Sequence, residues 1–327
     1  MNRRDLVLLG TSSLAATITA GLPGLAQSRY PDRPIRLVVP FAAGGVVDVI
    51  GRLWGEQIRP LLHTIVVENQ GGAGGTIGAA EVARAQPDGY TMLFGNTSTQ
   101  VLNPAVMARP PYDPATAFVT VSILANSAVS IAVNPQVPAK TLAELIAYIK
   151  ANPGKLSYGS PGAGTFTHLA GEMFKQLAGT PDVGHVPYKG AGPGISDLVS
   201  GHIPIMMLNV TNQAIELHKG GKIRILAVLT AKPLAALPGV PTGTETLQNL
   251  VAMLFTGLFM PAGTPKEIID RVAQANHTVM SDAGFRKRLV EMGFEPVADT
   301  PAEAERFIDA ERSRLLPLVK STGFTIG

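Results

Sequence analysis

The chain has 327 residues, of which 46% are hydrophobic and 16% are charged, and this composition supports a folded core and excludes a disordered chain. Its formal charge is only +3 at pH 7, with no stripe of Lys and Arg interleaved with aromatic residues, so we expect no nucleic-acid partner. The absence of cysteine excludes disulfides, thiol catalysis and cysteine-ligated metals.

Residues 1–26 have the three-part organisation of a cleaved export signal peptide. Arg3 and Arg4 precede an apolar run from Leu6 to Leu25, and Gly24-Leu25-Ala26 places small residues where a signal peptidase needs them. The alternative is a membrane anchor, but glycine and proline break the far end of the run and no stop-transfer charges follow. We therefore expect a periplasmic protein; the arginine pair suggests twin-arginine export, with the general secretory route left open.

The mature chain begins with alternating strands and helices. Hydrophobic periodicity predicts strands at 35–40, 64–68 and 90–94 and helices at about 46–62 and 76–85. A strand–helix–strand order of this kind implies a parallel sheet with right-handed crossovers.

A second alternating set follows two extended segments near 119–124 and 129–134. It comprises helices at 141–151, 166–178, 192–200 and 212–219 and strands at 156–159, 183–187, 203–208 and 223–229. The C-terminal third reads as mainly helical. We therefore predict two lobes, 27–125 with 250–327 and 126–249, each a parallel or mixed sheet flanked by helices, joined by a hinge of crossing strands. The Pro-rich segment 233–241 should lie near the second crossing.

Ligands of open α/β sheets bind beyond the carboxyl ends of the strands, and four such loops carry polar or glycine-rich sequence. They are Phe41–Asp48, with Gly44 and Gly45 before a helix, Gly95–Thr99, Ser160–His168 and His185–Gly190, with Asn209 completing the rim. Glycines let backbone N–H groups approach a ligand, and helix N-termini attract anions, so the loop at Ser160–His168 is a candidate anion cradle. The alternative for each loop is ordinary turn chemistry facing solvent.

Catalytic and metal-binding motifs are mostly absent. The chain has no G-x-S-x-G elbow, no phosphate-binding P-loop and no His spacing suited to a metal, and we expect no cofactor, no metal and no catalytic residue. One enzymatic alternative stays open, an exported α/β hydrolase of carboxylate esters that uses Ser160 and His168. It lacks an orienting acid at a readable spacing.

Several segments together resemble the Bug-type solute receptors of tripartite tricarboxylate transporters. The segments are Tyr30–Gly45, Val66–Gly78, Pro87–Thr91, Pro111–Pro114, Asn152–Leu156, Gly164–Glu172, Val186–Gly190 and Pro261–Pro265, in order to the end of the chain. The resemblance implies a two-lobed periplasmic binding protein of type II-like fold that closes on a small organic carboxylate. It implies delivery to a two-component membrane permease, and we expect a monomer; signalling to a membrane sensor is the alternative.

The resemblance also places the ligand between loops of the two lobes. The residues expected to bind it are Phe41, Ala43, Gly44, Gly45, Val46, Val47, Asp48, Asn96, Thr97, Ser98, Thr99, Ser160, Gly162, Ala163, Gly164, Thr165, Phe166, Thr167, His168, Tyr188, Lys189, Gly190, Asn209 and Phe255.

Four positions depart from the pattern common in this family. Val47 stands where a hydroxyl or amide residue is usual, Leu208 where many members have Asp, Phe255 where Trp is usual, and Thr256 where an aromatic follows. Leu208 removes a carboxylate partner for a ligand ammonium. We therefore expect a carboxylate without an amine and with one end less polar than citrate.

Overall fold

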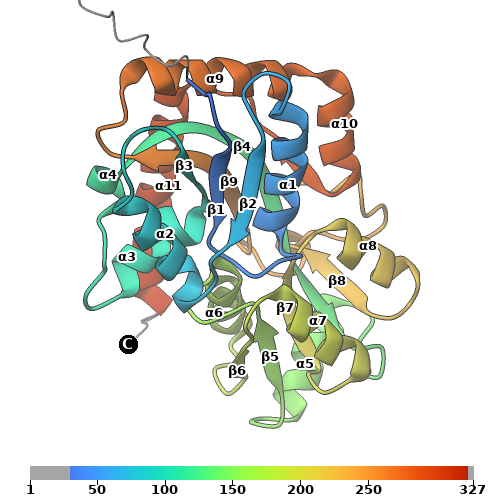
Figure 1. Ribbon diagram of the computed structural model, residues 1–327. Coiled ribbons are helices and arrows are strands. Elements are labelled where there is room, and N and C mark those ends of the chain that lie inside the picture. Colours follow the sequence, from blue (N-terminus) through green and yellow to red (C-terminus); the bar gives the residue numbers. More distant parts are fainter. Residues whose placement is uncertain (1–29, 323–327) are drawn as a thin grey trace, which may run out of the picture. The chain divides into compact units, whose positions relative to one another are not determined.

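The computed structural model describes residues 30–322, so the predicted export signal lies outside the described residues. Residues 31–322 belong to one compact unit in which strands and helices alternate (Figure 1). None of the helices between residues 30 and 322 combines the length and the apolar character that a bilayer span requires.

The first half of the chain builds one set of parallel strands and their crossover helices. In order it contains β1 (Ile35–Val39), α1 (Val46–Ile58), β2 (Ile65–Asn69), the 3-10 turn η1 (Ala73–Gly75), α2 (Thr76–Ala83), β3 (Thr91–Asn96), the π-helical turn η2 (Ser98–Leu102), α3 (Asn103–Val106), α4 (Pro114–Ala117) and β4 (Phe118–Val133). Strand β1 pairs in parallel with both β2 and β3, as the strand–helix alternation predicts.

The second half repeats this alternation and then returns to the first set. It contains α5 (Leu142–Ala151), β5 (Ser157–Ser160), α6 (Phe166–Ala178), β6 (Gly184–Pro187), α7 (Ala191–Ser200), β7 (Ile205–Asn209), α8 (Asn212–Lys219), β8 (Arg224–Val228), the 3-10 turn η3 (Gly243–Glu245), β9 (Met253–Pro261), α9 (Lys266–Ser281), α10 (Ala283–Glu291), β10 (Phe294–Pro296) and α11 (Pro301–Thr322). Strand β5 pairs in parallel with β6 and β7, whereas β9 runs antiparallel to β3 and β4. Both sets of strands are therefore of the expected parallel or mixed kind.

A single 16-residue strand, β4, runs through both sets. Its first part pairs with β9 and β10, and its last five residues pair with β7 and β8. Two separate extended segments, 119–124 and 129–134, were predicted here, and this was wrong because the structure has one continuous strand. The polar pair Asn126-Ser127 resembles a turn in sequence, but it lies opposite Phe255 and Leu254 of β9 and so stays in the strand.

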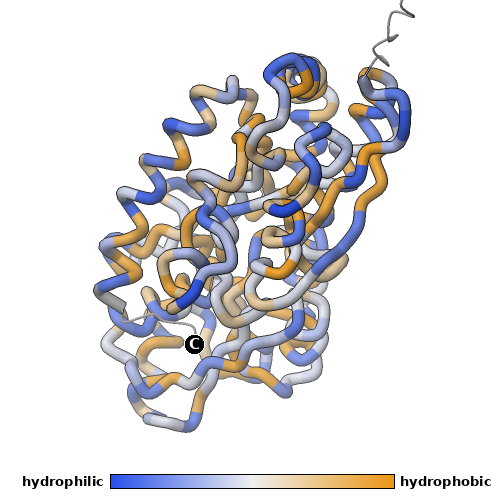
Figure 2. Tube along the Cα trace, turned by 60° about the vertical axis from the view of Figure 1, so that its left-hand side comes forward, coloured by the Kyte–Doolittle hydropathy of each residue, from blue (hydrophilic) through white to orange (hydrophobic). Residues whose placement is uncertain are grey.

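Strand β9 is the main element that the sequence did not predict, because the C-terminal third reads as helical. It inserts between β3 and β4 in the strand order β2-β1-β3-β9-β4-β7-β5-β6 and is buried along almost its whole length. Full burial removes the alternation of polar and apolar residues by which a strand is normally recognised. Figure 2 shows the contrast with the outer helices, which alternate hydrophilic and hydrophobic residues along their length.

Helices α1 and α9 are joined by a buried hydrogen bond between side chains far apart in the sequence. The indole Nε1 of Trp54 donates to Oδ1 of Asn276 over 2.8 Å, and both residues are at most 1% exposed. The Trp54 ring also packs on Phe94 of β3, with ring centroids 6.1 Å apart. Trp54 therefore links helices α1 and α9 to strand β3.

Replacing Trp54 by Phe should lower the free energy of unfolding by about 2–4 kcal/mol, because it leaves a cavity and an unpartnered buried carbonyl on Asn276. Urea unfolding monitored by circular dichroism measures this loss. Adding Asn276→Leu should recover part of it, since both polar partners are then gone. A double variant less stable than Trp54→Phe alone would show that the hydrogen bond is not the cause.

Candidate functional site

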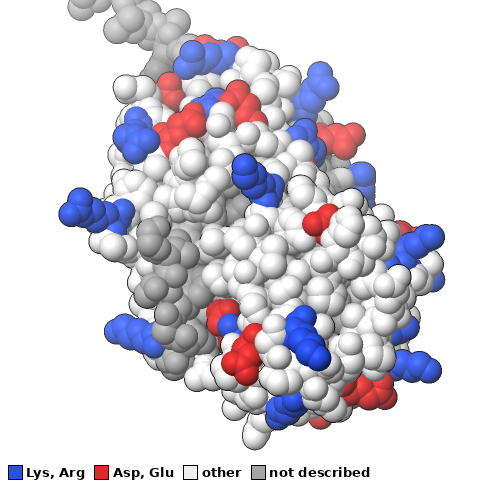
Figure 3. Space-filling view, turned by 90° about the horizontal axis from the view of Figure 1, so that it is seen from below, with Lys and Arg blue, Asp and Glu red and all other residues white. Residues whose placement is uncertain are grey.

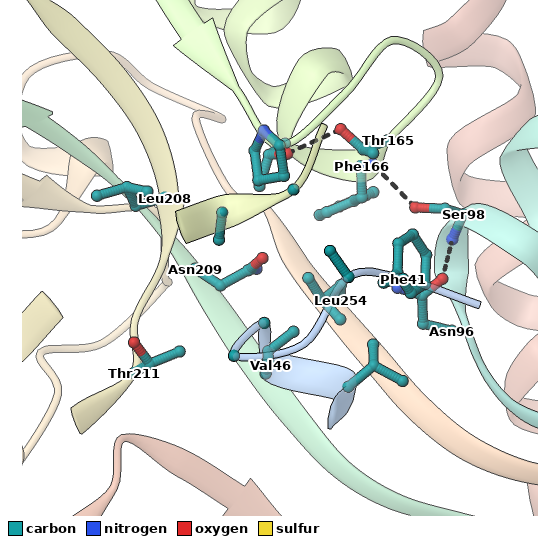
Figure 4. A pocket seen from close by; sticks show the side chains of 18 of the residues that line it. Phe41, Val46, Asn96, Ser98, Thr165, Phe166, Leu208, Asn209, Thr211 and Leu254 are labelled. Atoms are coloured by element: carbon teal, nitrogen blue, oxygen red, sulfur yellow. Dashed lines mark hydrogen bonds between the residues drawn. The ribbon is translucent and has the colours of Figure 1, made fainter. Parts of the chain in front are cut away.

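A pocket lies where the loops after β1, β3, β5, β6 and β7 meet. The space between its walls, counted together with its open mouth, is about 650 Å³. It is lined by Phe41, Ala42, Gly44, Gly45, Val46, Val47, Asn96, Ser98, Pro161, Thr165, Phe166, Thr167, Gly190, Ala191, Ile195, Leu208, Asn209, Thr211 and Leu254 (Figure 4). The carboxyl ends of strands from both halves of the chain thus share one cavity.

Each of the four predicted loops contributes at least one residue to the lining of this pocket. The predicted residues that line it are Phe41, Gly44, Gly45, Val46, Val47, Asn96, Ser98, Thr165, Phe166, Thr167, Gly190 and Asn209. The predicted residues that lie outside the lining are Ala43, Asp48, Thr97, Thr99, Ser160, Gly162, Ala163, Gly164, His168, Tyr188, Lys189 and Phe255. The lining residues absent from the prediction are Ala42, Pro161, Ala191, Ile195, Leu208, Thr211 and Leu254. Most of these seven residues are adjacent in the sequence to a predicted residue, so their position in the same loops could have identified them.

Asp48 supports the first loop from inside helix α1 and does not line the pocket. Its carboxylate accepts hydrogen bonds of 2.9 Å each from the Gly44 N–H, from Arg52 and from Asn69. Burial alone would raise the pKa of Asp48, but the hydrogen bonds from Arg52, Gly44 and Asn69 outweigh burial, and the pKa lies below its ordinary value. Asp48 is therefore a permanent anion that fixes the Gly44 turn.

The loop after β3 joins the start of helix α6 through Ser98. The Ser98 hydroxyl accepts a 3.0 Å hydrogen bond from the Phe166 N–H, and Asn96 Oδ1 accepts one of 3.0 Å from the Ser98 N–H (Figure 4). Thr97 and Thr99 use their hydroxyls on protein groups, since Thr97 accepts from the Phe255 N–H and Thr99 donates to the Asn96 carbonyl. These bonds fix the conformation of residues 96–99 at the edge of the pocket.

Helix α6 begins at the pocket wall. Its N-cap, Thr165, accepts a hydrogen bond from the His168 N–H, and the hydroxyls of Thr165 and Thr167 lie 2.9 Å apart. Thr165, Phe166 and Thr167 all line the cavity, so the first turn of the helix faces it. The positive end of a helix dipole is thereby directed at whatever occupies the pocket.

Helices α1 and α7 also begin at this pocket, and neither has a side-chain cap. Their N-caps are Gly45 and Gly190, and their first residues, Val46 and Ala191, line the cavity. The first N–H groups of a helix have no partner within it, so these two helix starts can donate hydrogen bonds to a bound molecule.

The described lining contains no charged side chain. Lys189, expected as a source of positive charge, is exposed and lies outside the lining. On the face seen in Figure 3, basic and acidic side chains are interspersed around a wide uncharged area. Any charge on a ligand must therefore be met by backbone N–H groups, hydroxyls and helix dipoles.

The rest of the wall is apolar, with one polar exception. Ile195, Leu208 and Leu254 contribute side chains from three elements, each at most 6% exposed. Asn209, beside Leu208, has an Nδ2 group that is buried and finds no hydrogen-bond partner among residues 30–322. A buried donor of this kind is costly unless a ligand or water accepts from it.

Ser160 and His168, the pair behind the hydrolase alternative, do not contact each other through their side chains. Ser160 is fully buried, and its Oγ lies 2.8 Å from Nε2 of His185 instead. His168 stacks on the imidazole ring of His185, with the two ring centroids 3.6 Å apart. Because none of the three lines the pocket, the serine hydroxyl does not face a bound molecule there.

Comparisons with known proteins give one consistent result. The sequence profile of the family described as "Tripartite tricarboxylate transporter family receptor" matches residues 52–324. Protein BugT of Bordetella pertussis is 30% identical over 320 residues, which cover 97% of this chain and 95% of that protein. The solved structure of the periplasmic binding protein BugD superposes with a TM-score of 0.86 at 33% identity, covering 90% of this chain and 99% of that one. The structure of R. palustris Rpa4515 with adipate gives a TM-score of 0.87 at 32% identity, with the same coverage.

Replacing Asp48 by Ala should lower the free energy of unfolding by about 2–4 kcal/mol, because two donors and a cation lose their buried acceptor. Chemical denaturation at pH 7.5 tests this. Glu56→Ala is the matched control, since Glu56 is an exposed acid on the same helix and should cost about 0.5 kcal/mol or less. Equal losses in the two variants would contradict a structural role for Asp48 at the Gly44 turn.

Proposed function

Because the chain belongs to the tripartite tricarboxylate transporter receptor family, we propose that its pocket captures a small organic carboxylate outside the cytoplasm. Members of this family are solute-binding receptors, and this chain is a receptor and not an enzyme. The expected resemblance and the two-lobed α/β fold are confirmed, and the hydrolase alternative is wrong.

The observation that carries the proposal is the uncapped start of α1 and α7 at a pocket whose described lining holds no charged side chain. Two helix N-termini with spare N–H donors are a ready site for a carboxylate. The start of α6, where Thr165, Phe166 and Thr167 line the cavity, adds the positive end of a third helix dipole. A cation at this pocket would meet the same dipoles unfavourably, so an anion is the preferred ligand.

The apolar part of the wall limits what else the ligand can carry. Ile195, Leu208 and Leu254 offer no partner to a second hydrophilic group, and no acidic side chain in the part of the chain that the structure describes lines the pocket to receive an ammonium. Asn209 Nδ2, a buried amide group without a partner among residues 30–322, can donate to a further oxygen of the ligand. The ligand we propose is a carboxylate without an amine whose body is apolar. The adipate bound by the R. palustris relative has this character, since methylene groups join its carboxylates.

Closure on the ligand would follow from the division into lobes 27–125 with 250–327 and 126–249. Strand β4 crosses from one set of strands to the other and β9 returns beside it, so these two strands are the proposed hinge. Ser98 from the first lobe and Phe166 from the second already share a hydrogen bond at the pocket. A ligand that touches both sides would favour the closed arrangement by its own contacts.

The receptor would work as a periplasmic monomer after removal of the signal at residues 1–26. Related proteins of this family are periplasmic, as the BugD structure is described. The permease expected to accept the ligand has two membrane components, and a membrane sensor is the alternative partner. Twin-arginine export is proposed from Arg3-Arg4.

Binding is tested by a thermal-shift screen of mature protein refolded from denaturant to remove carried-over ligand. The panel contains adipate, malate, citrate, benzoate, aspartate, glutamate and glucose. Adipate or benzoate at 100 times its dissociation constant should stabilise the protein by about 2.7 kcal/mol, which raises the melting temperature by a few degrees. Larger shifts with aspartate or glutamate, or a shift with glucose alone, would contradict the proposal.

Replacing Leu208 by Asn should weaken adipate binding by about tenfold or more, because an apolar contact becomes a polar group without a partner. Binding of malate, which is shorter and carries a hydroxyl, should weaken less. Isothermal titration gives the ratio of the two affinities. Leu226→Asn is the matched control, since Leu226 is equally buried in β8 and lies outside the lining. It should destabilise the fold and leave the ratio unchanged; an unchanged ratio in Leu208→Asn would contradict the assigned role.

A further inference from the structure

A stack of three rings lies directly beneath the pocket loop Pro161–Thr165. The rings of Tyr158 and His185 have centroids 4.9 Å apart, and His168 covers His185 at 3.6 Å with an interplanar angle of 15°. Helix α6 makes room for the stack with Gly171, where an added Cβ would come within 2.1 Å of the Tyr158 ring. The stack is thus a built feature of the fold that the ligand-binding proposal does not use.

Both histidines contact the pocket loop through their ring nitrogens. His168 Nδ1 accepts a 3.3 Å hydrogen bond from the Gly164 N–H, and His185 Nε2 lies 2.8 Å from Ser160 Oγ. Ser160 Oγ in turn accepts from the Gly162 N–H and lies 3.1 Å from the Gly162 carbonyl. The Thr165 hydroxyl donates to that same carbonyl over 2.7 Å. The conformation of the loop is therefore fixed from below by the two imidazoles.

The bond to Gly164 requires an uncharged His168 ring. A protonated imidazole carries a hydrogen on both nitrogens and cannot accept from a backbone N–H. Two stacked imidazoles 3.6 Å apart also cannot both be charged without strong repulsion. Burial, then the neighbouring His185 and Lys175, lowers the pKa of His168 to about 3, and burial lowers the pKa of His185 to about 4.

The charged groups near the two rings do not offset the preference of both imidazoles for the uncharged form. Two charged groups that act on the two rings are Glu172 and Lys175, both on α6. Glu172 accepts hydrogen bonds from Tyr158 Oη over 2.7 Å and from Lys175 Nζ, and it lies 3.9 Å from His168 Nε2. The carboxylate is thus shared with two other donors.

We propose that His168, supported by its stack on His185, is a positioning residue that holds the loop Pro161–Thr165 in its ligand-binding conformation only while its ring is uncharged. The proposal rests on the carboxylate-binding function proposed above and adds a pH dependence to it. The ring of His168 resists protonation while it accepts the hydrogen bond from the loop, so its pKa is lower in the docked state than in the released state. The free energy that favours the docked loop is therefore fully present above pH 6.5 and decreases as the pH falls toward 3. Acid therefore releases the loop and the ligand.

The first test needs no ligand. In amide NMR spectra of the refolded protein, the Gly164 signal should shift with pH together with the His168 ring signals and with the same midpoint, well below 6.5. In His168→Asn the part of this shift that follows the His168 midpoint should be absent, because the Asn oxygen takes the place of Nδ1 and does not titrate in this range. A Gly164 signal that ignores the titration of His168 would overturn the proposal.

The second test uses adipate as the probe, with isothermal titration at pH 7.5 and at pH 4.0, which lies closer to the expected midpoint of His168. The wild-type affinity should fall about tenfold more between these values than the affinity of His168→Asn, in which adipate and His185 still titrate but residue 168 does not. His168→Leu, with no acceptor, should bind weakly at both values. Equal pH dependence in wild type and His168→Asn, or full affinity in His168→Leu at pH 7.5, would overturn the proposal.

His218→Asn is the matched control. His218 Nδ1 also accepts a backbone N–H, that of Ile225 over 3.2 Å, and burial also lowers its pKa, but it lies on α8 away from the pocket lining. This variant should keep the wild-type pH dependence of adipate binding; loss of that dependence would overturn the assignment to His168. Failure of adipate to bind at all would count against the proposed function, while the Gly164 signal would still decide the role of His168.

Discussion

The whole site depends on one constraint: an anion has to be held in a pocket to which residues 30–322 contribute no charged side chain. Burying a carboxylate without a partner is very costly, so the partners must be dipoles that are already oriented when the ligand arrives. The starts of α1, α6 and α7 supply such dipoles, and glycine caps at 45 and 190 leave N–H groups of two helices available. Recognition by dipoles leaves no net charge stranded when the pocket empties, which suits a receptor that has to release its ligand.

The topology explains how so many helix starts reach one place. In parallel strand–helix units every helix starts near the carboxyl end of a strand, so β1 and β3 of one set and β5, β6 and β7 of the other bring five such ends to the pocket. Strand β4 passes through both sets and fixes them with their carboxyl ends facing the same cavity. Asp48 and Ser98 then hold the individual loops, the first through the Gly44 turn and the second through the start of α6.

The sequence predicts which loops reach the pocket better than it predicts which of their side chains line it. Loop positions follow from strand ends, which periodicity reveals, so Gly44, Ser98, Thr165 and Asn209 fall on the pocket wall as expected. Which side chain of a loop faces the ligand depends on local hydrogen bonds, and Thr97 is engaged by the protein for that reason. Long-range pairs leave no local signal: strand β9 and the pairing of Ser160 with His185, 25 residues away, required the three-dimensional structure.

The most direct test of dipole-based recognition is a crystal structure of the mature protein with adipate. The account predicts one carboxylate of adipate within hydrogen-bond distance of the helix starts at Val46, Ala191 or Thr165–Thr167, and the methylene groups against Leu208 and Ile195. No Lys or Arg side chain should lie within 4 Å of that carboxylate, the usual reach of an ion pair. A carboxylate bound to Lys189 or another cation, or adipate located outside this pocket, would contradict it.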